Sequence, residues 1–235
     1  EGADILHEEN LVVRAAELLR AETGRDEKLL IHLCKRIPLA AGLGGGSTDA
    51  ASTLRALNEF WSLSLTEATL TSLAAKLGSD VPFFLHGGTA LATGRGEVLT
   101  PLPASPPLWL VLVTPPQRVP NKTRLAYARL NPAHYSVGER TKRLIAVLQS
   151  GRPLESHQLF NTFEQVTEGL FPGLGHLRER LESTFGRPTH LAGAGPSLFC
   201  LFASGQEAEE AAQRLIEPEA SVFVARFTSR LPQCA

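Results

Sequence analysis

Hydrophobic positions along the chain recur with two different spacings, which predict both helices and strands. Apolar residues three or four apart predict amphipathic helices, which we place at residues 11–22, about 50–61, 66–77, 123–130, 138–149, 174–185 and 205–216. Alternating or short continuous apolar runs predict strands, which we place at 29–35, 89–93, 97–102, 108–114, 188–192, 198–203 and 221–227. Asn10 is a favourable N-cap for the first helix, and Gly24 is a favourable residue to end it. The strands at 89–93 and 97–102 flank Gly94-Arg95-Gly96 and are expected to form a hairpin.

Four prolines crowd a short segment after the predicted hairpin, at Pro101, Pro103, Pro106 and Pro107. Because proline interrupts both helices and central strands, we place a domain boundary there, between residues 1–105 and 106–235. Beyond the boundary, merging neighbouring helices gives the order β-α-β-β-α-β, which is similar to a ferredoxin-like plan. The predicted fold class is therefore α+β.

Composition narrows the class of protein. The 235 residues are 43% hydrophobic and carry a net charge of −1, which is typical of a globular protein rather than a strongly basic nucleic-acid binder. We therefore do not expect nucleic acid as a partner. No apolar run reaches the length of a membrane span, so we do not expect a membrane as a partner either. The chain contains no methionine, from which we expect that Glu1 is not the natural start.

The cysteines and histidines suggest no metal site. Cys34, Cys200 and Cys234 are odd in number and far apart, which favours neither a disulfide framework nor a CxxC metal site. We expect two of them to be small buried residues and the third to be a thiol in the tail, as suits a reducing cytoplasmic location. The seven histidines show no HxH or HxxxH pair, so the metal ligands stay unassigned.

The segment Gly42-Leu-Gly-Gly-Gly-Ser-Thr-Asp49 leads directly into a predicted helix. Glycines allow backbone N–H groups to approach an anion closely, and the N-terminus of a helix favours negative charge. Ser47 and Thr48 add hydroxyl groups that donate hydrogen bonds or cap the helix. A flexible capped turn is the alternative, but four glycines and two hydroxyl residues leading into a helix favour a phosphate-binding loop.

Better-known glycine motifs do not fit this segment. A Walker A loop ends in Gly-Lys-Ser/Thr, and no lysine is present here. The dinucleotide motif GxGxxG fails because Ser47 stands at the position of its third glycine, which disfavours a dinucleotide oxidoreductase. The hydrolase motif GxSxG fails because Asp49 stands at the position of its last glycine.

A second glycine cluster, Gly193-Ala-Gly195-Pro-Ser197, joins two predicted strands. Taken alone it indicates only a tight turn. Taken with the first cluster, it is a candidate to fold over a ligand and close the site.

These segments resemble the GHMP kinases. The pattern from Pro38 to Thr48 is similar to that family's ATP-binding motif, and the second glycine cluster is similar to its C-terminal glycine motif. One branch of the family is more similar still, through the segments Glu9-Asn-Leu-Val-Val-Arg-Ala-Ala, Lys35-Arg-x-Pro, and Gly78-Ser-Asp-Val-Pro-Phe-Phe. Members of that branch phosphorylate the 2-hydroxyl of a cytidine diphosphate-linked methylerythritol in the non-mevalonate route to isoprenoids. The resemblance covers nearly the whole chain and is strongest from residue 9 to residue 88.

The resemblance implies a two-domain GHMP kinase fold, with an incomplete N-terminal part like domain 2 of ribosomal protein S5 and a ferredoxin-like C-terminal domain. It also implies ATP and Mg²⁺ as cofactors and a small-molecule substrate. The implied ATP-binding residues are Asn10, Leu11, Lys35, Pro38, Leu39, Ala40, Ala41, Gly42, Leu43, Gly44, Gly45, Gly46, Ser47 and Thr48. Asp80 corresponds to the catalytic aspartate, and Thr123, Gly193 and Gly195 to residues near the phosphoryl acceptor.

The sequence departs from the family in two places. Thr48 stands where the family more often has serine, which keeps the hydroxyl. The family's opening strand with Pro-Ala-Lys-x-Asn and its Gly-Tyr-His segment do not occur in the 235 residues. The resemblance therefore leads us to expect that a catalytic lysine and part of the substrate pocket lie outside this sequence.

Simpler roles compete with the implied ones. From spacing alone, Asp80 is expected to cap a turn or a short helix, Asn10 to cap the first helix, and Lys35 to extend from the end of a strand. The resemblance favours a kinase of the methylerythritol branch. Another GHMP kinase, of the homoserine or mevalonate type, and a non-catalytic nucleotide-binding protein remain as alternatives.

Overall fold

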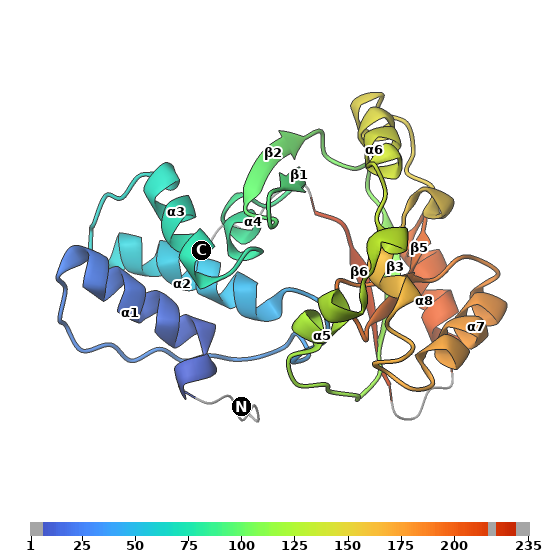
Figure 1. Ribbon diagram of the computed structural model, residues 1–235, viewed down its shortest axis with the longest axis horizontal. Helices are drawn as coiled ribbons and strands as arrows, with labels where there is room; N and C mark the ends of the chain where they lie inside the picture. The colour runs from blue at the N-terminus through green and yellow to red at the C-terminus, as the bar shows by residue number, and fades with distance from the viewer. Residues whose placement is uncertain (1–6, 216–219, 229–235) are drawn as a thin grey trace. The chain divides into compact units, whose positions relative to one another are not determined.

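The computed structural model describes residues 7–215 and 220–228, which divide into two compact units (Figure 1). Among the described residues, the first unit contains 7–39 and 44–102, and the second contains 40–43 and the remainder from 103 onward. Residues 40–43, which begin the glycine-rich loop, therefore belong to the second unit, although a single boundary at residue 105 would assign them to the first.

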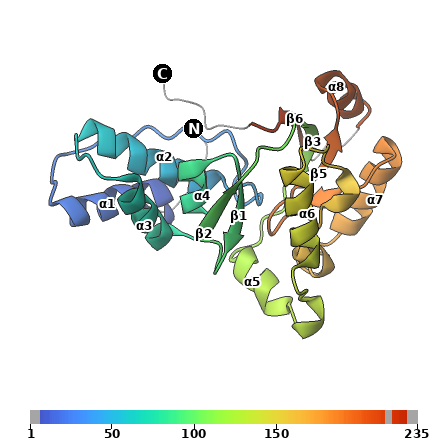
Figure 2. The same ribbon diagram turned by 90° about the horizontal axis from the view of Figure 1, so that it is seen from above.

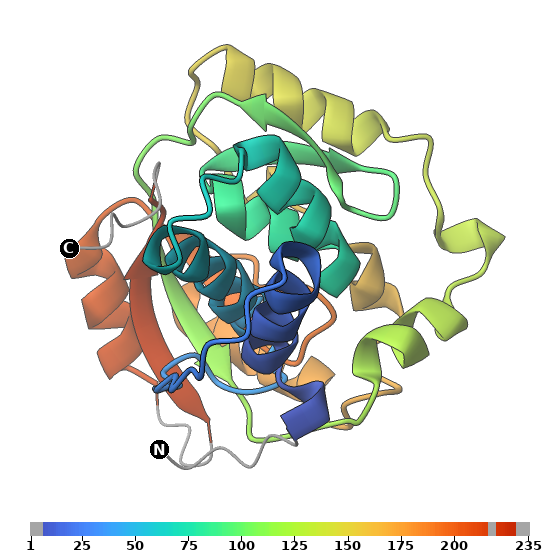
Figure 3. The ribbon, with the colours of Figure 1, turned by 90° about the vertical axis from the view of Figure 1, so that its left-hand side faces the viewer.

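The first unit is built on helices α1 (Leu11–Thr23), α2 (Gly45–Phe60), α3 (Glu67–Leu77) and α4 (Val81–His86), and a short 3-10 turn, His7–Glu9, precedes α1. Asn10 caps α1 by accepting a hydrogen bond from the Val12 N–H at 3.0 Å, and Gly24 ends the helix in the left-handed conformation. The helices contact one another around a single core, and Figure 3 shows them gathered together. The predictions for the helices ending near Gly24, Trp61 and Gly78 are confirmed.

A hairpin completes the first unit. Strand β1 (Thr89–Thr93) pairs antiparallel with β2 (Val98–Leu102), with Thr93 opposite Val98. The predicted hairpin is confirmed to within one residue at the turn.

The second unit contains a four-stranded sheet formed by β3 (Trp109–Thr114), β4 (His190–Leu191), β5 (Leu198–Phe202) and β6 (Ser221–Arg226). The strands lie in the order β4-β5-β3-β6, and all neighbours are antiparallel. Helix α7 (Leu174–Phe185) connects β3 to β4, and α8 (Gly205–Gln213) connects β5 to β6. The predicted ferredoxin-like order is thereby confirmed.

Both connecting helices cover the same face of this sheet. Figure 2 shows α7 and α8 beside the strands of this sheet. Val111 and Val113 on β3 lie opposite Cys200 and Leu198 on β5, and all four are fully buried in one core with the apolar sides of α7 and α8. Between β3 and α7 the chain forms the helices α5 (Lys122–Arg129) and α6 (Glu139–Gln149), and the 3-10 turns Pro132–His134, Ser156–Gln158 and Thr162–Gln165. No helix in the described ranges is long and apolar enough to cross a membrane.

The strand predicted at 29–35 is wrong. The segment has no regular structure, and Leu30 is 83% exposed. An alternating pattern produces a strand only where a neighbouring strand accepts its backbone hydrogen bonds, and no described strand pairs with this segment. Cys34 consequently is exposed, whereas Cys200 is buried as expected and Cys234 lies outside the described residues.

Candidate functional site

The N-terminus of α2 presents unpaired backbone donors. Gly44 is the N-cap in the left-handed conformation, with φ of 69°, and no side chain caps the helix. The N–H groups of Gly45, Gly46 and Ser47 have no acceptor among the described residues, whereas the Thr48 N–H already bonds to the Gly44 carbonyl at 2.9 Å. Unpaired N–H groups and the helix dipole together make this end of α2 suited to an anion.

Side chains of the first unit pack closely against the N-terminus of α2. A Cβ atom at Gly44 would overlap the ring of Phe84, and one at Gly45 would lie 2.9 Å from the Ile37 Cγ2 atom. At Gly46 the nearest atom is Leu11 Cδ1, 3.5 Å from the position of a Cβ. Close packing therefore requires Gly44 and Gly45, whereas Gly46 has room for a Cβ atom beside Leu11.

The two hydroxyls of the loop differ in availability. Thr48 Oγ1 donates to the Gly44 carbonyl at 3.0 Å, within its own helix. Ser47 Oγ makes no hydrogen bond with any described residue. Of the two predicted hydroxyl groups, Ser47 is thus the one left free for a ligand.

Lys35 and Asp49 form an ion pair beside the helix end. The Lys35 ammonium bonds to Asp49 Oδ2, and the two side chains are only 9% and 24% exposed. Lys35 Nζ is 3.4 Å from the position of a Cβ at Gly45, so its charge lies at the first turn of α2. Sequence reasoning assigned no role to Asp49, because the burial of Lys35, which calls for an acidic partner, becomes visible only in the folded chain.

Asp80 lies in the N-cap position of the short helix α4, but its side chain accepts no capping hydrogen bond. Its carboxylate is exposed and has no hydrogen-bond or ion-pair partner in the described part of the chain. One turn further along α4, Phe84 touches Gly44. The position of Asp80 matches the simpler prediction, yet the carboxylate performs no capping and stays available for chemistry.

The two glycine clusters meet within the second unit. A Cβ at Gly42 would overlap the Ala192 carbonyl oxygen, and one at Gly193 would lie 2.8 Å from the Gly42 oxygen. The Ser197 N–H also donates to the Ala41 carbonyl at 3.3 Å. These backbone contacts explain the glycines at both places, since any side chain would separate the two segments.

The second cluster is itself held by side chains. Asn161 Nδ2 donates to the carbonyl oxygens of Leu191, at 3.0 Å, and Gly193, at 2.7 Å. Lys122 Nζ donates to the Gly195 carbonyl. Sequence reasoning assigned a role to neither residue, because each acts across many residues of sequence and no local motif marks it.

The remaining predicted residues make fewer contacts. Pro38, Leu39 and Ala40 form the turn before the glycines, and Ala40 has a positive φ of 55°. Thr123 is exposed in the first turn of α5, with no hydrogen-bond partner in the described ranges. The same ranges contain no cluster of three or more His, Cys, Asp or Glu side chains suited to a metal ion, so no Mg²⁺ ligand set is assigned.

Family models match both parts of the chain. Residues 10–88 match the GHMP kinases N terminal domain, and residues 144–220 match the GHMP kinases C terminal domain. The first match contains the helix end of α2 and Asp80, and the second contains the second glycine cluster.

Curated relatives are similar over most of the chain. A protein of Pelotomaculum thermopropionicum named 4-diphosphocytidyl-2-C-methyl-D-erythritol kinase is 42% identical over 234 residues, which cover 98% of this chain and 81% of that protein. A protein of the same name from Shouchella clausii is 40% identical, over 85% of this chain and 66% of that protein.

Solved structures share the fold. A crystal structure of 4-(cytidine 5'-diphospho)-2C-methyl-D-erythritol kinase superposes with a TM-score of 0.79 at 35% identity, covering 95% of this chain and 80% of that one. Homoserine kinase from Cytophaga hutchinsonii superposes with a TM-score of 0.72 at 19% identity, covering 95% of this chain and 77% of that one. The second likeness concerns the fold alone.

Proposed function

Since this chain belongs to the GHMP kinase family, we propose that it transfers the γ-phosphoryl group of ATP to the 2-hydroxyl of 4-diphosphocytidyl-2-C-methyl-D-erythritol, a step in isoprenoid precursor synthesis. The observation that carries the choice of substrate is the identity of about two residues in five with kinases of that name, across both domains. A shared fold alone supports only the wider family, because one fold hosts many substrates.

The N-terminus of α2 is the proposed binding site for the ATP phosphates. Gly45, Gly46 and Ser47 offer three backbone donors, and the free Ser47 hydroxyl offers a fourth. Fixed donors of this kind stabilise the negative charge on a phosphoryl group during transfer and need no reorganisation. When bound, ATP supplies the phosphoryl group and carries most of the coordination of Mg²⁺, whose protein ligands are not assigned.

The Lys35–Asp49 pair serves the same helix end in this proposal. Asp49 alone would place a negative charge in the second turn of α2, close to the bound phosphates. Lys35 neutralises it while its own nitrogen stays beside Gly45. The adenine is proposed to lie near Asn10, Leu11 and Lys35, and Leu11 Cδ1 lies 3.5 Å from the position of a Cβ at Gly46.

Asp80 is the proposed catalytic base. Its carboxylate oxygen can accept the proton of the acceptor hydroxyl as the bond to phosphorus forms, which keeps a positioned nucleophile reactive. No described side chain competes for this carboxylate. Thr123, Gly193 and Gly195 are proposed to lie near the acceptor, and a cytoplasmic location is proposed on the separated cysteines.

A panel of acceptors tests the substrate. The protein encoded by the full gene is incubated with ATP, Mg²⁺ and 4-diphosphocytidyl-2-C-methyl-D-erythritol, homoserine or mevalonate, and the phosphorylated product is followed by mass spectrometry. We expect product with the cytidyl substrate only. Phosphorylation of homoserine or mevalonate but not of the cytidyl compound would assign the protein to another branch, and ATP binding without turnover of any acceptor would indicate a non-catalytic nucleotide-binding protein.

The role of Asp80 is tested in the same assay. Asp80→Asn should lower turnover by about a thousandfold, as loss of a general base does, while the dissociation constant for ATP stays unchanged. Asp26→Asn, which alters another exposed carboxylate of the first unit, should leave both quantities as they are. Undiminished turnover in Asp80→Asn would refute the assignment.

A further inference from the structure

Lys122 is a buried cation without an acidic partner. It is 9% exposed, and the Gly195 carbonyl is the acceptor of its ammonium. No carboxylate in the described ranges forms an ion pair with it. Burial lowers the pKa of the Lys122 ammonium to about 8. Buried charges are normally paired, because an isolated ammonium loses on the order of several kcal/mol of hydration free energy when it leaves water.

The ammonium lies where the two glycine clusters touch. Its acceptor, the Gly195 oxygen, is also 2.9 Å from the position of a Cβ at Gly42, so this oxygen contacts the loop directly. Asn161 holds the other end of the same cluster through Gly193. Lys122 and Asn161 together fix the segment against which the beginning of the phosphate loop rests.

We propose that Lys122 is a positioning residue for the nucleotide: its ammonium holds the Gly195 carbonyl against Gly42 and brings positive charge to the beginning of the phosphate-binding loop, at residues 40–43. This inference rests on the proposed function, since it presumes that a polyphosphate binds there. Residues 40–43, where the loop begins, belong to the same unit as Lys122 and the second cluster, so the hydrogen bond to Gly195 acts on the beginning of the loop within that unit.

A purely structural role does not explain the choice of lysine. A neutral donor such as Gln or Ser would bond to a carbonyl without the cost of removing a charge from water. An anion bound nearby favours a cation here, because the attraction between the two charges offsets the lost hydration. The presence of a lysine here therefore indicates recognition of the phosphates of ATP and not of its adenine base.

The test separates binding of phosphates from binding of the base. Dissociation constants for ATP, ADP and adenosine are measured by calorimetry with the full chain, for the wild type, Lys122→Met, Lys122→Gln and Lys122→Arg. Lys122→Met should weaken ATP and ADP by about tenfold or more, as expected for a lost charged interaction, with adenosine changed less than about twofold. Lys122→Gln, which keeps a donor, should fall between, and Lys122→Arg should stay within about threefold of the wild type.

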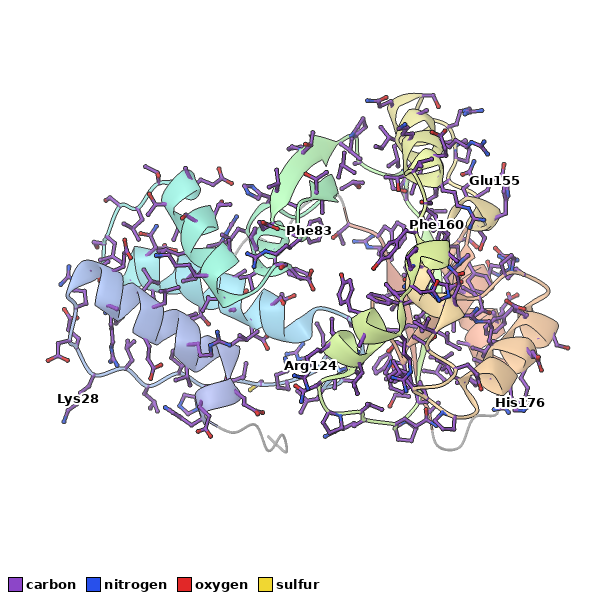
Figure 4. All side chains as sticks on the ribbon, in the orientation of Figure 1. Lys28, Phe83, Arg124, Glu155, Phe160 and His176 are labelled. Carbon is purple, nitrogen blue, oxygen red and sulfur yellow. The ribbon has the colours of Figure 1, made fainter. Side chains whose placement is uncertain are left out.

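A neighbouring cation provides the control. Arg124, labelled on α5 in Figure 4, is exposed and two residues away, and Arg124→Met should leave all three constants unchanged. In steady-state kinetics, Lys122→Met should raise the KM for ATP and leave kcat within about threefold. Lys122→Gln repeats the measurement if Lys122→Met does not fold.

Two results with the variants would overturn the inference, and one with the wild type. One is unchanged ATP affinity in Lys122→Met and Lys122→Gln. The other is equal loss for ATP and adenosine, which would mean that the lysine only supports the fold. If the wild-type chain binds adenosine but neither ATP nor ADP, the proposed phosphate site is wrong and the inference falls with it. A failure confined to the variants leaves the proposed function standing.

Discussion

Glycine has different roles in the two glycine clusters. At the N-terminus of α2, Gly45 and Gly46 leave backbone donors without acceptors, so this cluster is open to a ligand. The Gly193–Ser197 cluster is closed, because Lys122 and Asn161 donate to two of its carbonyl oxygens and its backbone rests on Gly42. In the proposed function, the first cluster binds the phosphates of ATP and the second supports the beginning of that loop at Gly42.

The difference arises from what surrounds each cluster. The first cluster continues into a helix of sixteen residues, whose first turn cannot satisfy its own donors. The second joins two antiparallel strands, so its ends are fixed at a short distance and its backbone bonds locally, with the Ala192 N–H donating to the Ser197 carbonyl at 2.9 Å. A glycine-rich sequence therefore identifies a ligand site only together with the element that follows it.

Within the two clusters, the largest expected effect on ATP affinity is at Gly42, where the clusters touch. Gly42→Ala would force its Cβ into the Ala192 carbonyl oxygen at a φ of 83°, so one backbone must move. We expect ATP affinity to fall by about a hundredfold or more, with a lower melting temperature, because a buried backbone clash is costly. Calorimetry and thermal unfolding measure the two effects.

Gly24→Ala is the matched control for this prediction. Gly24 has a φ of 70°, but a Cβ there meets no atom within 4 Å. The Gly24→Ala protein should lose about 1 kcal/mol of stability, and its affinity for ATP should not change. Equal loss of affinity in both variants would mean that backbone strain, and not contact between the clusters, is responsible.

The next effect distinguishes two adjacent hydroxyls. Ser47→Ala should raise the KM for ATP by about tenfold, because a free donor at the helix end is removed. Thr48→Ser, which keeps the hydroxyl that bonds to Gly44, should change KM by less than twofold, or about 0.4 kcal/mol. Steady-state kinetics at varied ATP decides, and a larger effect at Thr48 would reverse their assignment.

A smaller effect on affinity is expected at Asn161, which only supports the closed cluster. Asn161→Ala removes the hydrogen bonds to Leu191 and Gly193 and should cost about 1–3 kcal/mol of stability. ATP affinity should fall only a few fold. Denaturant unfolding and calorimetry measure both, and a hundredfold loss of affinity without destabilisation would show that Asn161 contacts the ligand.

The smallest expected effect is the uptake of less than one proton for each ATP bound. Burial places the pKa of Lys122 at about 8 in the free protein, below the ordinary value of 10.5. A bound polyphosphate favours the ammonium and raises that pKa, so binding between about pH 8 and 9 should take up protons. Below this range the lysine is already protonated, and uptake from this group should fade.

Calorimetry in buffers of different ionisation enthalpy measures this uptake. At pH 8.5 the wild type should take up more protons per ATP bound than Lys122→Met. Equal uptake by the two proteins would mean that the ammonium does not sense the phosphates.

Local signals were enough to predict most elements of the fold. Asn10 and Gly24 bound the first helix, and Thr66 and Gly78 bound α3, because caps act within a few residues. The segment 29–35 failed because a strand depends on a partner that its own residues do not specify. The hairpin succeeded because its partner is only a turn away.

In the candidate site, too, the residues marked by local sequence were predictable and the others were not. The glycines and hydroxyls at the start of α2 were predictable, since they adjoin the helix in sequence, although α2 begins at Gly45 and not at about residue 50. Lys122, Asn161 and Asp49 were not, because each contributes through a contact with a residue that is distant in sequence or newly buried. Folding, and not a motif, brings these side chains to the loop.

The most direct test is to observe which backbone N–H groups respond to ATP. In ¹H–¹⁵N spectra of the full chain, titrated with ATP in the absence of an acceptor, the largest shifts should occur at Gly45, Gly46 and Ser47. Gly193 and Gly195 should move less, as parts of a supporting segment. If Gly193 and Gly195 show the largest shifts while Gly45, Gly46 and Ser47 stay still, the phosphates do not bind at the N-terminus of α2 and the account is wrong.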